Sequence, residues 1–146
     1  MPSGPLAAYD ALTGGRSRPV RVDELCRIAA ERFPGLVPGT EALAAEARLA
    51  QKDKRGLEKA QGAFLAAVLA DPAAGAHLCH AMLLPREDSR RHLAEFEAKG
   101  KLELDGAKLE RLGKAAVVTM RNPRYLNAED ETTLEGLERA MRQLAK

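Results

Sequence analysis

Four residues in one short segment carry side chains that could bind a ligand. They are Arg124, Tyr125, Asn127 and Glu129. A guanidinium such as that of Arg124 can make bidentate contacts with a phosphate group. A carboxylate such as that of Glu129 needs a partner or a ligand if it is buried. A plainer interpretation stands beside this one: the arginine is a solvated loop residue, the tyrosine packs beneath the loop, the asparagine caps a helix, and the glutamate is a solvated first-turn residue.

The segment lies between an apolar run and a helical repeat. Residues Ala115–Met120 are apolar on both faces and rich in β-branched side chains, which predicts a strand of the kind that is buried between two layers in a parallel sheet. Asn127 is of an N-cap type, and the acidic residues after it favour the start of a helix. The helical repeat then consists of Leu134, Leu137, Met141 and Leu144. We therefore expect a strand, an exposed loop and an amphipathic helix over Ala128–Ala145.

Helical patterns dominate the chain before Gly100. Apolar residues at helical spacing predict a helix over Val22–Phe33, which the following Pro-Gly pair ends. An aspartate cap followed by proline predicts a second helix over Pro72–Leu83. Between them, Glu41–Leu69 contains no proline, and its charged middle predicts either a solvated stretch or a helix break. A further helix begins near Ser89 and ends at Gly100.

The pattern changes after Gly100. Leu102 and Leu104 alternate with charged residues and precede Asp105-Gly106, a strong hairpin signal, so a strand is expected over Lys101–Leu104. The predicted class is α+β. We expect a mobile N-terminus at residues 1–20 and a helical domain at residues 21–100. Residues 101–146 are expected to form the first β-hairpin or strand and the first helix of a larger α/β domain, which is incomplete here.

Composition narrows the possible functions. The net charge is only +2, acids are interleaved with bases, and aromatic residues make up 3% of the chain, so we expect no nucleic-acid partner. The longest apolar stretch, Ala63–Ala70, is too short to span a bilayer, and no signal peptide is evident, so a cytoplasmic protein is expected. Cys26 and Cys79 fit neither ligand nor redox spacing and are expected to be buried free thiols. His77 and His80 share a helix face, but no third ligand is suitably spaced, so packing is preferred to metal binding.

Two tripeptides connect this chain to a known family. Arg121-Asn122-Pro123 follows the apolar strand, and Asn127-Ala128-Glu129 precedes the amphipathic helix. This arrangement resembles the opening of the crotonase (enoyl-CoA hydratase/isomerase) superfamily, whose usual pattern is a strand, N-R-P, a few residues and N-A-L. Here the order of the first tripeptide is changed, and glutamate replaces the leucine of the second. With the apolar segments Ala63–Pro72 and Ala74–Pro85, the ensemble resembles the N-terminal region of the acyl-CoA dioxygenases of that superfamily, which belong to antibiotic biosynthesis and carry a helical domain before the crotonase core.

The resemblance implies an oxidoreductase that needs no metal and no other cofactor. Its substrates would be an arylacetyl-CoA thioester and O₂, and its products an aryl glyoxylate and CoA. In the family, both oxyanion-hole N–H groups come from segments well downstream of the Asn-Ala stretch, so no catalytic residue is expected in this chain. The chain would contribute substrate and CoA binding, with Arg124, Tyr125, Asn127 and Glu129 as the candidate residues. Its expected partners are acyl-CoA, the remainder of the crotonase-like domain and, in the full-length enzyme, further copies of itself.

Two other interpretations remain open at this stage. One is a non-catalytic helical interaction module with a vestigial β-unit, and the other is a fragment of an enoyl-CoA hydratase/isomerase-type enzyme. The DNA downstream of the codon for Lys146 would discriminate the dioxygenase from the interaction module. An in-frame or frameshifted continuation with a glycine segment resembling F-x-A-G supports the dioxygenase, whereas a stop codon without a related partner gene supports the interaction module.

The sequence generates one prediction about Glu129. In a complete enzyme, Glu129→Leu should lower kcat/KM about tenfold for an aryl substrate with ring hydroxyls, because a hydrogen bond to a charged group contributes ~1.5–3 kcal/mol. Unhydroxylated phenylacetyl-CoA should be nearly unaffected, since its ring makes no such bond. Steady-state kinetics with both thioesters measure the difference, and equal effects on the two would remove Glu129 from the site.

Overall fold

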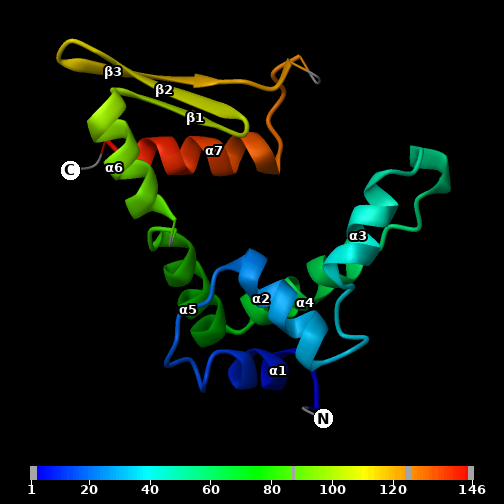
Figure 1. The fold of residues 1–146 in the computed structure, drawn as a ribbon. Coiled ribbons are helices and arrows are strands. Elements are labelled where there is room, and N and C mark those ends of the chain that lie inside the picture. Colours follow the sequence, from blue (N-terminus) through cyan, green and yellow to red (C-terminus); the bar gives the residue numbers. More distant parts are fainter. Residues whose placement is uncertain (1–2, 87, 124–125, 145–146) are drawn as a thin grey trace. The chain divides into compact units, whose positions relative to one another are not determined.

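Helices make up the first part of the chain, and a small sheet appears only in the second part (Figure 1). The computed structural model describes residues 3–86, 88–123 and 126–144. Within these residues there are seven α-helices, a short 3-10 helix and one three-stranded antiparallel sheet, which confirms the α+β class. The chain divides into two units, Met1–Leu84 and Pro85–Lys146, called unit 1 and unit 2.

Unit 1 is helical and has its own apolar core. Its elements are α1 (Pro5–Leu12), α2 (Val22–Arg32), α3 (Thr40–Ala47), the 3-10 helix η1 (Gln51–Asp53), α4 (Glu58–Ala70) and α5 (Pro72–Leu83). Helices α2 and α5 confirm the two helices predicted in this region. The N-terminal segment differs from expectation. It was expected to be mobile, yet α1 belongs to the core because Tyr9 and Leu12 are fully buried there. The surrounding proline, glycine and serine residues concealed this short apolar helix.

The stretch Glu41–Leu69 is divided between α3 and α4 by a break at its charged middle. Between α3 and α4, the buried carboxylate of Glu46 accepts hydrogen bonds from the backbone N–H groups of Arg55, Gly56 and Leu57, at 2.5, 3.0 and 2.7 Å. Burial acts to raise the pKa of Glu46, but these N–H donors outweigh it and hold that pKa below its usual value. The charged stretch is therefore a helix break whose two ends are joined by one side chain.

Unit 2 is a three-stranded meander with helices around it. Its elements are α6 (Ser89–Lys99), β1 (Lys101–Leu104), β2 (Ala107–Leu112), β3 (Ala115–Met120) and α7 (Glu131–Arg142). The strands lie in the order β1-β2-β3, and both pairs are antiparallel. The predicted bounds of β1 and β3 are confirmed. The prediction of a parallel, doubly buried β3 is wrong, because two-residue turns reverse the chain on both sides of β2 and exposure alternates along β3.

The boundary between the units also differs from the expected position near Gly100. The division falls at Leu84–Pro85, so α6 belongs to unit 2. The reason is packing: Phe96 of α6 is buried with Leu102 of β1 and Leu109 of β2. Gly100 ends α6 in a left-handed conformation, with φ of 66°, and leads directly into β1. The change from helix to strand at this glycine therefore lies within unit 2.

Helix α7 lies along one face of the sheet and approaches the β1–β2 turn backbone to backbone (Figure 1). A Cβ atom at Gly106 would lie 2.6 Å from the carbonyl oxygen of Thr132 and 2.7 Å from Cα of Thr133. A Cβ atom at Gly136 would meet the carbonyl oxygen of Asp105 and would lie 3.0 Å from Cβ of Ala107. Glycine is thus required at both positions for this close contact.

The buried side of α7 is not the leucine repeat that identifies the helix in the sequence. The sheet-facing side consists of small or polar residues, namely Thr133, Gly136, Ala140 and Gln143. In the repeat, Leu134 and Met141 are 53% and 57% exposed. Because the sheet approaches so closely, large side chains are excluded from the contact and the leucine repeat lies beside it.

Two helical glycines in different surroundings predict opposite effects of substitution by alanine. Gly136→Ala should destabilise unit 2 by about 1–3 kcal/mol, because the added methyl group overlaps the hairpin backbone. Gly62→Ala, in the interior of α4 with nothing within 4 Å of the added Cβ, should stabilise unit 1 by up to about 1 kcal/mol. Denaturant unfolding followed by circular dichroism measures both. A Gly136→Ala protein as stable as the parent would contradict the contact.

Candidate functional site

The candidate site lies in the loop between β3 and α7 and beside the adjoining end of the sheet. Two of the four residues predicted to bind a ligand, Arg124 and Tyr125, lie outside the described residues. The other two, Asn127 and Glu129, are both exposed, and neither belongs to α7. Of these two residues, Asn127 is the one held in place by hydrogen bonds within the loop.

Two asparagines close this loop. The backbone N–H of Asn122 donates to Oδ1 of Asn127 at 2.7 Å, and the N–H of Asn127 donates to the carbonyl oxygen of Asn122 at 2.7 Å. The side-chain amide of Asn122 also donates to the carbonyl oxygen of Ala128 at 2.9 Å. Asn127 has a φ of 58°, a left-handed conformation that asparagine tolerates better than most residues. Asn127 fastens the loop, and the expectation that it caps the helix is wrong.

Asp130 is the residue that caps α7. Its Oδ1 accepts from the backbone N–H of Thr133 at 3.0 Å, and the Thr133 hydroxyl accepts from the Asp130 N–H at 2.8 Å, which completes a capping box. Asn122 donates to the other carboxylate oxygen at 2.9 Å. The helix thus begins at Glu131, three residues later than predicted. The sequence signal for this cap was an aspartate followed three residues later by threonine.

Glu129 lies one residue before the cap. It is exposed and outside the helix, so its carboxylate is open to water. The substitution of glutamate for the apolar residue of the usual pattern therefore demands no buried partner within this chain. A ligand contact at Glu129 would have to come from a molecule that docks on the exposed side of the loop.

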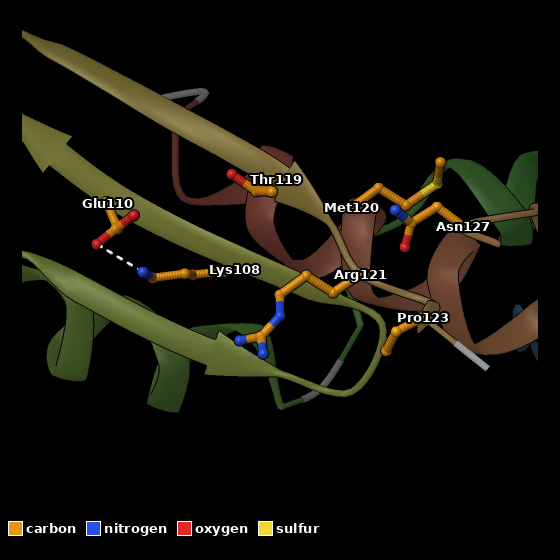
Figure 2. A pocket seen from close by; sticks show the side chains of 7 residues that line it. All are labelled: Lys108, Glu110, Thr119, Met120, Arg121, Pro123 and Asn127. Atoms are coloured by element: carbon orange, nitrogen blue, oxygen red, sulfur yellow. Dashed lines mark ion pairs between the residues drawn. The ribbon is translucent and has the colours of Figure 1, made fainter. Parts of the chain in front are cut away.

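A pocket of about 530 Å³ opens beside Asn127, on the face of the sheet opposite α7 (Figure 2). Its lining consists of Lys108, Glu110, Thr119, Met120, Arg121, Pro123 and Asn127. Lys108 pairs with Glu110 at 2.8 Å, as Figure 2 shows, and Arg121 pairs with Glu103 at 3.0 Å. Each cation is thus already balanced by a carboxylate. The pocket lining is therefore polar and carries little net charge. It offers a ligand both cationic N–H donors and carboxylate acceptors.

The sequence did not single out Lys108 or Arg121. Lys108 stands opposite Thr119 in the β2–β3 register, and alternation along these strands places both side chains on the face away from α7. The signal available was the period of two in β2, where Lys108 and Glu110 alternate with the buried Ala107 and Leu109. That alternation identifies the face of the sheet that points away from α7. The pocket on this face is completed by the β3–α7 loop, which the two asparagines hold closed.

The other residues considered for chemistry do not assemble with this loop. His77 is hydrogen-bonded through Nδ1 to the hydroxyl of Tyr9 at 2.6 Å, and His80 is exposed. Among the described residues, no three His, Cys, Asp or Glu side chains are grouped so that they could hold a metal ion. Cys26 is buried, as expected, but Cys79 is exposed, because it lies on the outer side of α5. Both cysteines are free thiols.

No single helix of the described residues is long and apolar enough to cross a membrane. Only α4 and α5 taken together reach the required length and composition, and they meet at a bend of 114°.

Comparison with known proteins shows a relative of this chain. No family model matches the chain. The chain is 43% identical, over 133 residues, to (3,5-dihydroxyphenyl)acetyl-CoA 1,2-dioxygenase from Amycolatopsis orientalis. The match covers 91% of this chain but 31% of the relative, so the chain spans about a third of the length of that protein.

The helix cap predicts a pH dependence of stability. The Thr133 N–H, together with Asn122 and against the effect of burial, holds the pKa of Asp130 below its ordinary value of 3.8. A carboxyl group whose pKa is lower in the folded state stabilises the fold above the ordinary value and loses that effect as the pH falls through the folded value. The stability advantage of the parent over Asp130→Asn, which keeps the cap without the charge, should therefore vanish in acid.

Thermal midpoints measured from pH 7 down to pH ~2.5 test this expectation. Asp130→Ala serves as the control, because it removes the cap itself and should remain less stable than Asp130→Asn across the range. A constant difference between the parent and Asp130→Asn at all pH values would contradict the role of the charge.

Proposed function

We propose that this chain is the N-terminal part of an acyl-CoA dioxygenase of the crotonase superfamily and that it contributes to binding of the thioester substrate. The single observation that carries the proposal is the 43% identity to (3,5-dihydroxyphenyl)acetyl-CoA 1,2-dioxygenase over almost the whole chain. The match covers 91% of the chain and therefore reaches into both units.

The proposed reaction is ArCH₂C(O)S-CoA + O₂ → ArC(O)COOH + CoA-SH. The carbon beside the thioester first loses a proton and becomes a carbanion or enolate. O₂ then attacks this carbon, and cleavage of the C–S bond releases CoA. Both oxygen atoms of O₂ enter the glyoxylate, and the two hydrogens of the methylene group end on the acid and the thiol. Because the substrate supplies all the electrons that O₂ takes up, the proposal includes no metal, no organic cofactor and no external reductant.

In this proposal the chain binds and orients, and the missing part performs the chemistry. An enolate needs N–H donors directed at the thioester oxygen, and each such donor lowers the barrier by about 3 kcal/mol or more. Those donors are assigned to the part of the enzyme outside this chain. The pocket beside Asn127 supports a binding role, because Lys108, Arg121 and the Asn127 amide line it and carry N–H donors. Both cations are paired with carboxylates, so the lining suits neutral polar groups such as the carbonyl oxygens of an acyl-CoA.

The test is a chimera in which this chain replaces the matching segment of the Amycolatopsis orientalis enzyme. The chimera should consume O₂ and release CoA thiol when given (3,5-dihydroxyphenyl)acetyl-CoA, whereas the isolated chain should show no thioester-dependent O₂ consumption. An oxygen electrode measures the consumption of O₂, and a thiol assay measures the release of CoA in the same turnover.

Two controls make the result interpretable. The relative's remaining segment without this chain should be inactive, and the relative's intact enzyme should be active under the same conditions. A chimera that folds with the thermal stability of the intact relative but turns over no substrate would overturn the proposal. Turnover by the isolated chain would overturn the assignment of chemistry to the missing part.

A further inference from the structure

The positive charge of the chain is concentrated in one segment of unit 1. Residues 48–59, called the basic arm, follow α3 and include η1 and the start of α4 (Figure 1). The arm has two acidic residues, Asp53 and Glu58, and five basic ones, which are Arg48, Lys52, Lys54, Arg55 and Lys59. Its surplus of three positive charges exceeds the net charge of +2 of the whole chain, so the rest of the chain carries one more acid than base.

The five basic side chains of the arm are all exposed and are not neutralised by carboxylates. Exposed cations elsewhere in the chain do have such partners, as Arg27 has in Glu31 at 2.6 Å. Among the residues that the structure describes, no carboxylate forms an ion pair with a basic side chain of the arm. These charges are therefore available to an anion from outside the chain.

Glu46 explains why the arm keeps its charge. This glutamate precedes the arm in the sequence, but its carboxylate is buried and accepts the backbone N–H groups of Arg55, Gly56 and Leu57. Because those donors satisfy its oxygens, the carboxylate is not a partner for the basic side chains. The same hydrogen bonds hold the backbone that follows Arg55 in one conformation. The arm thus presents its cations from a fixed turn.

Lys59 lies against this turn. A Cβ atom added to Gly56 would be 3.0 Å from Cε of Lys59 and 3.4 Å from its Nζ. The ammonium group is therefore beside the backbone that follows Arg55. An anion bound at the turn can accept hydrogen bonds from a guanidinium and an ammonium group together.

The composition of the arm favours a small ligand with several phosphate groups. Guanidinium and ammonium groups both bind phosphate oxygens, and a cluster of cations attracts a ligand that carries several negative charges. Residues 48–59 contain no aromatic residue, so the arm provides no ring on which the bases of a nucleic acid could stack. Leu49 is the one large apolar side chain that the described arm exposes, which is less than binding to a membrane surface requires.

We propose that the basic arm binds the phosphate groups of the acyl-CoA substrate. This inference rests on the proposed function, which supplies a ligand of the required chemistry, since CoA carries a diphosphate and a 3′-phosphate on its nucleotide. The cations that line the pocket beside Asn127 do not serve this purpose, because Lys108 and Arg121 are already paired with carboxylates. The arm offers the phosphates cations that no acid of the described residues has neutralised.

The test is a calorimetric titration of CoA onto the full 146-residue chain at low ionic strength. The arm variant, Lys52→Gln with Arg55→Gln, should bind CoA about tenfold more weakly or worse, because it removes two charge-assisted contacts. The control variant, Lys101→Gln with Lys114→Gln, removes the same charge from exposed positions of unit 2 and should bind as the parent does. Both variants should keep the thermal midpoint of the parent, since all four side chains are exposed.

Two further probes show whether the arm recognises the nucleotide phosphates. Pantetheine, which lacks phosphate, should not bind, and inorganic phosphate should bind far more weakly than CoA. The inference is overturned if the parent does not bind CoA or if the arm variant and the control variant bind it equally. Inorganic phosphate that binds as tightly as CoA would mark an adventitious ion only, and an oligonucleotide that binds more tightly than CoA would assign the arm to a nucleic acid instead.

Kinetics of the chimera separate this inference from the proposed function. In the chimera, the arm variant should raise KM for (3,5-dihydroxyphenyl)acetyl-CoA about tenfold and leave kcat unchanged, because it removes binding that is equal in the ground state and the transition state. The pantetheine thioester of the same acid should be turned over equally with and without the substitutions. Turnover with an unchanged KM would overturn the role of the arm alone. Arm-dependent binding of CoA without any turnover would overturn the proposed function alone.

Discussion

The backbone contact between α7 and the β1–β2 turn determines how unit 2 is arranged. Gly106 and Gly136 bring the helix and the hairpin closer than any pair of side chains would allow. Because the helix is held so near the sheet, its buried side must be small, and Thr133 and Ala140 satisfy that requirement while remaining fully buried. The same contact fixes where the β3–α7 loop starts and ends, and it leaves the larger apolar residues of α7 beside the sheet.

The loop is a consequence of this placement. The chain must travel from the end of β3 to the start of a helix on the other face of the sheet, and Asn122 spans the distance with its side chain. Its amide contacts both Ala128 and the capping carboxylate of Asp130, at 2.9 Å each. The pocket and the helix cap are therefore coupled through one residue. A ligand that displaces Asn127 would act on the start of α7 through the same hydrogen bonds.

Much of the fold follows from local signals in the sequence. The proline after Asp71 and the β-branched run at Ala115–Met120 set α5 and β3 at their predicted bounds, because caps and periodicity act over a few residues. The burial of Tyr9 and the exposure of Leu134 could not be predicted in this way. Both depend on what packs against the helix, and no local pattern contains that information. In the site, the polar residues of the loop were recognised, but their roles were not. Asn127 was expected to cap the helix, but Asp130 does so, and Asn127 closes the loop instead. Either residue type can cap a helix, and Asn127 lies in the left-handed turn at Leu126 and Asn127.

The Glu46 carboxylate joins α3 to α4 through the backbone N–H groups of three successive residues, and this has an evolutionary consequence. Every residue except proline carries such a donor, so the contacts themselves require no particular side chain. The left-handed φ of 74° at Gly56 favours glycine at that one position. Substitutions at residues 48–54 then leave the hydrogen bonds of Glu46 unaffected, as long as the glutamate itself is kept. Among homologous sequences, the segment between the two helices would vary in length around a constant acidic residue, and an alignment of such sequences would show it.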